Sequence, residues 1–236
     1  MTKGWTSMAA AELRRWTRSA WAVFRKDWGS ELRTRYAMSA LLMFVITTVA
    51  VIMFSLGGES APPDVLSGIF WVVVFFAAMS GLSRTFISEE ERGTAMGLQL
   101  MATPSAVFVG KLFFNLVLLA GVNTVVVVLC LLFVNGFVIE TASLFLITLA
   151  LGTAGMAAAS TVIAAIIARA NTKGTLYPVL SFPILLPLLL AVINATRLSS
   201  EGAPLAEAGG EFQLLISYIV VVIAASLVLF EYIWKD

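Results

Sequence analysis

The residue types best suited to chemistry gather in one polar stretch, which reads ISEEERGTAMGLQLMATPS from Ile87 onward. Three consecutive glutamates follow Ser88, and long apolar runs lie on both sides of the stretch. Ser88 and Glu91 have the S-x-x-E spacing of a capping box, and carboxylates are favourable at a helix N-terminus. Pro104 ends the stretch, because the residue before a proline is biased away from helical angles. The pattern predicts a short, capped helix that presents charge and a small apolar patch to water.

Residue content excludes several kinds of catalysis. The chain has no histidine and a single cysteine, Cys130, which lies inside an apolar run. A Ser–His–Asp triad and a metal site built from His or Cys are therefore out of reach of one copy. The Gly110–Lys111 pair lacks the upstream glycine and the following hydroxyl of a phosphate-binding loop. The sequence predicts a protein that is not an enzyme, holds no metal, and takes any energy it uses from another subunit.

Composition places these residues in a membrane protein. Of the 236 residues, 60% are hydrophobic and 12% are charged, and the mean hydropathy is +0.96. A soluble domain carries about 25% charged residues, so this chain has too little polar surface to cover a globule of its size. The predicted fold class is all-α integral membrane. The few charged residues must then be positioned by helices that cross the bilayer.

Six apolar runs are long enough to cross a bilayer, for which a helix needs about 20 mostly apolar residues. None of these runs contains Asp, Glu, Lys or Arg, whereas ion-coupled carriers and charged channel filters need such groups at membrane depth. The six predicted crossings are residues 37–56, 65–83, 112–139, 141–168, 175–196 and 212–230. The predicted domains are a cytoplasmic N-terminal segment (1–36), a six-helix domain (37–230) with a cytoplasmic loop (84–111), and a short cytoplasmic tail (231–236).

The placement of Lys and Arg predicts the orientation of these crossings. Every one of the 15 Lys and Arg residues except Arg197 falls on the same side of a six-crossing topology, together with both termini. Cytoplasmic loops carry the excess of Lys and Arg in membrane proteins. We therefore expect both ends of the chain, and the glutamate-rich loop, to lie in the cytoplasm.

The segment from about Met8 to Tyr36 has the pattern of an amphipathic helix. At 100° per residue, its cations gather on one third of the helix and most of its apolar residues on the other side. A basic amphipathic helix of this kind lies in the plane of the membrane surface. The alternative is a connector helix that packs beside the crossings and touches a cytoplasmic partner. The residues concerned are Arg14, Arg15, Trp16, Arg18, Trp21, Phe24, Arg25, Lys26 and Trp28.

Two features within the apolar runs have a packing interpretation and a functional one. Pro178, Pro183 and Pro187 each remove a backbone donor, which predicts a bent packing helix or, alternatively, a hinge. Gly155 and Ala159 are small residues at four-residue spacing, which lets helices approach closely. That approach is expected within the protomer, with a homodimer seam as the alternative.

Aromatic residues concentrate in the half of the second run that is predicted to lie away from the cytoplasm. A belt of aromatic rings at the membrane interface accounts for Phe70 and Trp71. The alternative is a substrate-facing site that stacks a flat, hydrophobic molecule. The residues of that alternative site are Phe70, Trp71, Phe75 and Phe76.

The polar stretch also resembles a known family. SEEERGTAMGLQLMATPSAVFVGK is similar to the segment after the second crossing of ABC-2-type ABC transporter permeases. Along nearly the whole chain, the resemblance is to the cytochrome c maturation permease B family, also called haem exporter protein B. FRKDWGSELRTRYAMSALLMF, LSGIFWVVVFFAAMSGLSRTFISEEERGT, the triple-proline run and LFEYIWKD carry it. One departure is Met96, which stands where an acidic residue is common in the family.

The resemblance implies a function and a set of partners. It implies the membrane permease subunit of an ABC complex of the bacterial inner membrane, with two permease copies and a separate cytoplasmic ATPase that binds the ATP. Two further membrane proteins and a haem chaperone are implied as partners, with haem as the cargo. The implied ATPase-coupling loop comprises Ser88, Glu89, Glu90, Glu91, Arg92, Gly93, Thr94, Leu98, Met101 and Pro104.

Two alternatives stay open at this stage. One is an ABC-2 permease that exports another lipid-like or hydrophobic molecule. The other is a non-transporting assembly factor, whose ATP-driven motion releases the haem-loaded chaperone. The chain lacks histidine, the commonest haem ligand, and its nine methionines are scattered without a facing pair. We therefore expect no directly bound cofactor.

Overall fold

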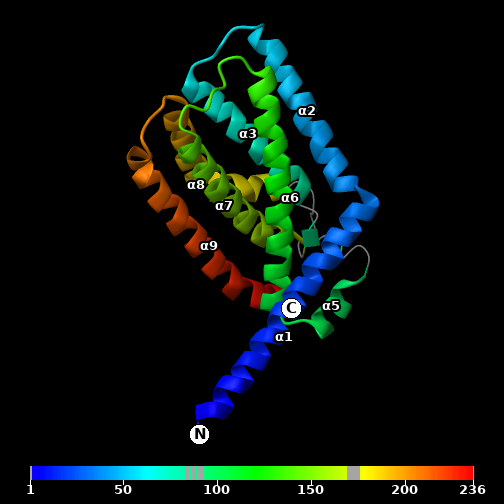
Figure 1. The fold of residues 1–236 in the computed structure, drawn as a ribbon. Coiled ribbons are helices and arrows are strands. Elements are labelled where there is room, and N and C mark those ends of the chain that lie inside the picture. The colour runs from blue at the N-terminus through cyan, green and yellow to red at the C-terminus, as the bar shows by residue number, and fades with distance from the viewer. Residues whose placement is uncertain (1, 83–84, 87–88, 90–92, 169–175, 236) are drawn as a thin grey trace.

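The computed structural model describes residues 2–82, 85–86, 89, 93–168 and 176–235, and every regular element among them is helical. Figure 1 shows their arrangement. In chain order, the elements are α1 (Thr2–Thr34), α2 (Tyr36–Leu56), α3 (Pro63–Leu82), α5 (Ala95–Met101), α6 (Pro104–Phe133), α7 (Ala142–Ala168), α8 (Leu176–Ser200), the 3-10 turn η1 (Leu205–Ala208) and α9 (Gly209–Lys235).

Six of these helices, α2, α3, α6, α7, α8 and α9, are long and apolar enough to cross a membrane. The predicted all-α membrane fold with six crossings is therefore confirmed. The largest difference in boundaries is at α6, which begins at Pro104 instead of residue 112. Pro104 occupies the first turn, where its missing N–H costs no hydrogen bond, and Thr103 before it is extended. The early start brings Lys111 inside the helix.

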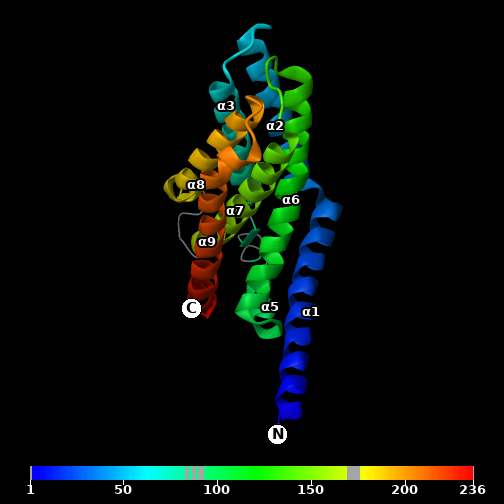
Figure 2. The same ribbon diagram turned by 60° about the vertical axis from the view of Figure 1, so that its left-hand side comes forward.

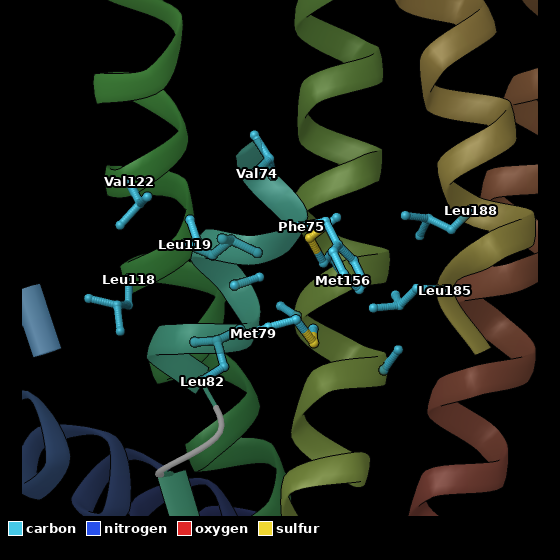
Figure 3. Close-up of a cluster of buried hydrophobic side chains, with 14 of the residues drawn as sticks. Val74, Phe75, Met79, Leu82, Leu118, Leu119, Val122, Met156, Leu185 and Leu188 are labelled. Atoms are coloured by element: carbon cyan, nitrogen blue, oxygen red, sulfur yellow. The ribbon is translucent and has the colours of Figure 1, made fainter. Parts of the chain in front are cut away.

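α7 lies at the centre of the bundle, and α2 and α9 lie at its outside. In the apolar windows of these helices, 78% of the α7 residues are buried, against 17% in α2 and 11% in α9. Figure 3 shows the core between α3, α6, α7 and α8, where Phe75 and Met79 of α3 face Met156 of α7. The arrangement leaves the faces of α2 and α9 for contact with lipid or with another protein.

The small residues of α7 pack within the chain. A Cβ atom added at Gly155 would overlap with Leu188 Cδ1 of α8, and the side chain of Ala159 is fully buried. The packing interpretation of this pair is therefore confirmed. Residues of α8 and α9 cover Gly155, and Ala159 is fully buried within the chain, so neither position is free to meet a second copy.

Pro183 and Pro187 lie inside a continuous α8, and Pro178 lies in its first turn. Tyr218 of α9 donates a hydrogen bond of 3.0 Å to the carbonyl oxygen of Ile184, between the two inner prolines. α8 is thus supported by a neighbouring helix where its own hydrogen bonding is interrupted. The hinge stays a prediction.

Both termini lie at the same end of the bundle, as Figures 1 and 2 show. We call this the termini end; it comprises α1, α5, the start of α6 and the end of α9. The far end comprises residues 57–62, 134–141 and 201–208. In both views α1 runs beside the first part of α6 and continues past the bundle to the N-terminus.

Candidate functional site at the junction of α1 and α6

α1 packs closely against the first turns of α6. The indole N–H of Trp16 donates a hydrogen bond of 2.9 Å to Ser105 Oγ. Further along, a Cβ atom added at Gly110 would lie 2.6 Å from the carbonyl oxygen of Ala20 and 2.8 Å from Val23 Cβ. Glycine at this position therefore permits the close approach. The packing part of the connector-helix interpretation is confirmed, while contact with a cytoplasmic partner stays a prediction.

Aromatic rings extend this contact toward the middle of α6. Phe24 meets Phe113 edge to face at 4.9 Å between ring centroids, and Trp28 meets Phe114 in the same way at 6.5 Å. Trp21 lies at the edge of the cluster, 6.4 Å from Phe113, and 57% of its surface is exposed. The aromatic face of α1 thus seats the helix on α6 and places the neighbouring charged residues over one spot.

At that spot four charged side chains form a closed ring, which we call the junction ring: Lys26, Asp27, Glu89 and Lys111. The Nζ of Lys26 is 3.0 Å from Asp27 Oδ1 and also pairs with Glu89 Oε1. The Nζ of Lys111 is 3.2 Å from Asp27 Oδ2 and 3.3 Å from Glu89 Oε1. Cations and carboxylates alternate around the ring, so each charge has two opposite neighbours and the ring is neutral.

Lys111 is the most deeply buried member of the ring, with 1% of its surface exposed. Besides the two carboxylates, its ammonium group donates a hydrogen bond of 2.8 Å to the carbonyl oxygen of Thr85. These partners use all three donors of the ammonium group. The Phe86 ring lies 4.9 Å from Nζ and adds a cation–π contact. A lysine buried in a membrane helix is costly unless it is paired, and here it is fully satisfied.

Glu89 connects the ring to the segment between α3 and α5. Thr94 donates from its hydroxyl to Glu89 Oε2 at 2.6 Å and from its backbone N–H to the Glu89 carbonyl oxygen at 3.0 Å. Burial by itself raises the pKa of Glu89, but Lys111, Lys26 and the Thr94 hydroxyl together lower that pKa to about 2. Burial lowers the pKa of Lys26, yet Asp27 and Glu89 outweigh it and raise that pKa. Glu89 and Lys26 therefore both carry their charges at neutral pH.

A line of neutral polar contacts continues from the ring into the bundle. The Thr85 hydroxyl is 2.9 Å from Asn115 Oδ1, and Asn115 Nδ2 donates a hydrogen bond of 2.9 Å to Thr161 Oγ1 of α7. Two turns deeper, Asn123 Nδ2 donates to Thr153 Oγ1 at 2.8 Å. These bonds link α6 to α7, so polar contacts extend from the ring to the central helix.

The described part of the predicted coupling loop divides into a buried and an exposed portion. Glu89 is buried in the ring, and Leu98 is partly buried against the core. Leu98 therefore does not project from the surface as a free apolar knob. The exposed apolar face of α5 instead consists of Met96, Leu100 and Met101, which are 71%, 84% and 85% exposed.

The other predicted loop residues that the structure describes are Gly93, Thr94 and Pro104. Gly93 lies in a turn with a φ of 66°, and Thr94 precedes α5 without a side-chain cap on it. Pro104 begins α6. Ser88, Glu90, Glu91 and Arg92 lie outside the described residues, and so does the predicted capping box.

The predicted aromatic site divides in the same way. Phe70 and Trp71 are fully enclosed by protein, and the Trp71 indole donates a hydrogen bond of 2.8 Å to Thr196 Oγ1 of α8. The aromatic-belt interpretation is therefore wrong for these two residues, because belt residues contact lipid headgroups. Phe75 is buried as well, whereas Phe76 is exposed. A substrate-facing role for the four rings stays a prediction.

Sequence reasoning missed two members of the ring, Asp27 and Lys111, and their neighbours Thr85 and Asn115. It treated Lys111 as a flank of the loop. The signal that was available is Pro104: a helix that starts there places Lys111 two turns inside α6, next to the apolar face that must pack. Among the described residues, no cluster of three or more Cys, Asp or Glu side chains is arranged to hold a metal ion.

A comparison with protein families supplies the identity that geometry alone does not. The model of the CcmB protein family matches residues 18–231, which include the whole junction ring and all but the last three residues of the six candidate membrane spans. The chain belongs to the CcmB protein family. Members of this family are permease subunits of the ABC haem exporter of cytochrome c biogenesis. The chain is therefore a multi-pass membrane component of that system. No curated protein matches the chain in a direct sequence comparison.

Membership of the CcmB family gives the site its context. A haem exporter of the ABC type implies a partner ATPase and other membrane subunits. The match begins at Arg18, so most of the part of α1 that packs against α6 lies within the family region, while Trp16 precedes it. The junction ring is thus built from segments of the matched region.

Proposed function

We propose that this chain passes movement from a cytoplasmic ATPase subunit into the membrane bundle, and that the junction ring is the joint. One observation carries the proposal: three segments of the chain meet at the buried ammonium group of Lys111. Asp27 comes from α1, Glu89 from the segment before α5, and Lys111 from α6. A load applied to either of the first two segments therefore reaches a membrane-spanning helix directly.

The proposal places the termini end in the cytoplasm of a bacterium, at its inner membrane. The support is the distribution of Lys and Arg, since Arg197 alone among the 15 lies on the other side of the six-crossing topology. Arg197 is in the last turn of α8 at the far end. With this orientation α5 and the first half of α1 face the compartment that contains ATP.

The exposed face of α5 is the proposed contact with the ATPase. Met96, Leu100 and Met101 form a small apolar surface on a helix of seven residues. Methionine and leucine side chains adapt to an apolar groove in a partner protein. Met96 stands where the family commonly has an acidic residue, so the contact in this protein is more apolar than in its relatives.

Movement of α5 is transmitted by two connections. Thr94, just before α5, binds Glu89 of the ring through its hydroxyl and its N–H. On α5 itself, Gln99 Nε2 donates a hydrogen bond of 2.7 Å to the carbonyl oxygen of Trp234 in α9. A shift of α5 therefore moves Glu89 relative to Lys111 and shifts the end of α9. Packed helices have discrete arrangements, so a small shift of this kind can switch the bundle.

In this proposal the work serves the handling of haem in cytochrome c maturation. Two copies of the chain, two ATPase copies and the other membrane subunits act on haem that is held by a periplasmic chaperone. The chain contributes movement and binds no ATP. Its lack of histidine supports a role in which the other subunits ligate haem.

The docking face is tested with matched variants of exposed leucines. Leu100→Asp on α5 is expected to remove the ATPase from the complex that is purified in mild detergent. Leu205→Asp makes the same change at an exposed leucine of the far end and should leave the ATPase bound. Equal recovery of the ATPase with both variants would rule out α5 as its contact.

The joint is tested with a variant that keeps the charge balance. Lys111→Met combined with Glu89→Gln removes one cation and one carboxylate and leaves the Lys26–Asp27 pair in place. We expect this protein to stay in the membrane with its ATPase, while the yield of cytochrome c falls by at least about tenfold, the factor that corresponds to 1.4 kcal/mol of lost coupling. A normal yield of cytochrome c in cells that contain this variant would refute the joint.

A further inference from the structure

The outer side of α1 carries an open hollow that the proposed joint does not use. It has a volume of about 430 Å³ and is lined by Arg18, Trp21, Ala22, Arg25 and Lys26. Three of these five residues are cationic and none is acidic. Among the described residues, no carboxylate pairs with Arg18 or Arg25, because Asp27 points toward Lys111 and Lys26. Lys26 is neutralised by the junction ring, so Arg18 and Arg25 are the two cations of the hollow that the described part of the chain leaves without a counter-ion.

The position of the hollow along α6 sets its depth in the membrane. The 30 residues of α6 span about 45 Å at a rise of about 1.5 Å per residue. The hydrocarbon layer is about 30 Å thick, so about ten residues of α6 lie outside it. The last turns of α6 are entirely apolar, whereas Lys111 lies near the start. The residues of α6 that extend beyond the hydrocarbon layer therefore lie at the start of this helix. There α1 packs against α6 between Ser105 and Phe114.

The rings beside the hollow connect it with the lipid phase. Trp21 lines the hollow and lies 6.4 Å from Phe113, which is itself 43% exposed on a membrane-spanning helix. Tryptophan is enriched at the level of the lipid headgroups because its ring is partly apolar and partly polar. The cations thus lie at headgroup level, with an exposed aromatic surface next to them on the membrane side.

We propose that this hollow binds the headgroup of an anionic phospholipid, with Arg18 and Arg25 on the phosphate, Lys26 beside them, and Trp21 and Phe113 against the upper acyl chains. Guanidinium groups donate paired hydrogen bonds to phosphate oxygens, which suits Arg18 and Arg25 for this contact. The lipid is favoured over an acidic protein segment because the cations continue into a lipid-exposed aromatic surface. The site goes beyond a general attraction of α1 to the membrane, since it assigns the binding to particular residues.

Lys26 belongs to both the hollow and the junction ring, so the test leaves it unchanged. The test variant is Arg18→Gln with Arg25→Gln. The matched control is Arg14→Gln with Arg15→Gln, which removes the same charge from exposed positions of the same helix outside the hollow. Both proteins are purified with their partner subunits from nanodiscs of phosphatidylcholine that contain a minor fraction of phosphatidylglycerol. Native mass spectrometry then counts the phosphatidylglycerol molecules that stay bound.

We expect the test variant to bind phosphatidylglycerol at least about tenfold more weakly than the wild-type protein, because each basic residue near the headgroups adds attraction. The control should bind it as the wild-type protein does. Equal losses in both variants would mean diffuse attraction and overturn the site. Unchanged phosphatidylglycerol, together with loss of an acidic protein from the test variant alone, would assign the hollow to that protein.

A second measurement decides the matter if the test variant does not fold. Trp21 fluorescence, isolated by subtraction of a Trp21→Phe protein, is measured in nanodiscs with bromine-labelled lipids. Brominated phosphatidylglycerol should quench it more strongly than the same fraction of brominated phosphatidylcholine. Equal quenching by the two lipids would contradict a site for the anionic headgroup.

Discussion

The two ends of the bundle are held together in different ways. At the far end, the carbonyl oxygen of Ser199 accepts hydrogen bonds from the backbone N–H groups of Glu140, at 3.2 Å, and Thr141, at 3.0 Å. The Ser199 hydroxyl donates to the Thr141 carbonyl oxygen, and the Thr141 hydroxyl to that of Ala203, each at 2.9 Å. At the termini end, the corresponding connections are the ion pairs of the junction ring.

This difference supports the proposal that the joint lies at the termini end. Backbone hydrogen bonds between neutral groups respond little to a change elsewhere in the molecule. An ion pair in a dry site changes steeply in energy when its members separate, because the local dielectric constant is low. The ring joins three segments of the chain, and each of its four members pairs with two others. The far end thus closes α7 on α8 through backbone hydrogen bonds, and the proposed joint lies at the end that is held by ion pairs.

The largest expected effect is that of Lys111→Met. The substitution leaves Asp27 and Glu89 buried with one cation between them, which costs about 3–5 kcal/mol for a buried pair. We expect a large fall in stability, measured as the thermal midpoint of the detergent-purified complex. Adding Glu89→Gln should recover much of that loss, because it removes the unpaired carboxylate. A single variant as stable as the wild-type protein would show that the ring contributes nothing.

Acid is expected to weaken the termini end before the far end. The pKa of Glu89 is about 2 in the folded protein and 4.5 ordinarily, so its ionised form stabilises the fold. That contribution is fully present above about pH 4.5, declines as the pH falls, and amounts to about 3 kcal/mol at most. The measurement compares the free energy of unfolding of the wild-type protein and of Glu89→Gln. Their difference should shrink between about pH 5 and 3, and a constant difference would contradict the ionic role of Glu89.

The contact of α1 with α6 is tested by adding one methyl group. Gly110→Ala forces α1 away from α6, because the new Cβ atom would lie 2.6 Å from the Ala20 carbonyl oxygen. Overpacking of this kind costs about 1–3 kcal/mol. Gly121→Ala on the same helix meets nothing within 4 Å and should gain up to about 1 kcal/mol from helix propensity. Thermal midpoints of the two variants are compared, and equal midpoints would mean that α1 is not seated on α6.

The smallest expected effect is at the ion pair of the far end. Arg197 and Glu201 are 2.5 Å apart and partly exposed, with 32% and 40% of their side-chain surfaces accessible. Arg197→Gln should therefore cost less than about 1 kcal/mol, and the cost should fall further in high salt. The same thermal assay measures it with and without salt. A loss as large as that of Lys111→Met would remove the distinction between the two ends.

The polar and apolar pattern of the chain was enough to predict the membrane class and the six crossings. Length and hydrophobicity of a run are local properties, and a bilayer demands the same of every spanning helix. The pattern also identified Pro104 as a boundary. The pattern placed the start of α6 too late, because a lysine such as Lys111 usually indicates a segment in water and outside a membrane helix. The structure shows that a buried lysine can lie inside the helix when Asp27 and Glu89 satisfy it.

The candidate site was predictable only in part. Glu89 and the exposed character of α5 follow from the sequence, since a charged stretch between two crossings must leave the membrane. The sequence did not indicate that Leu98 turns inward while Leu100 turns outward. That choice depends on how α5 lies against the end of α9, where Gln99 binds Trp234. In a helix of seven residues, periodicity is too short to select a face.

By itself, the sequence determined that this protein spans a membrane and that its cations gather on one side. Both properties depend on residue types counted along the chain. Tertiary structure alone decided that Asp27, Glu89 and Lys111 meet, since Asp27 and Lys111 are 84 positions apart and Glu89 and Lys111 are 22 apart. Their meeting requires α1 to settle on α6 at Gly110. Opposite charges attract over a few ångströms in a dry site, and only packing brings them that close.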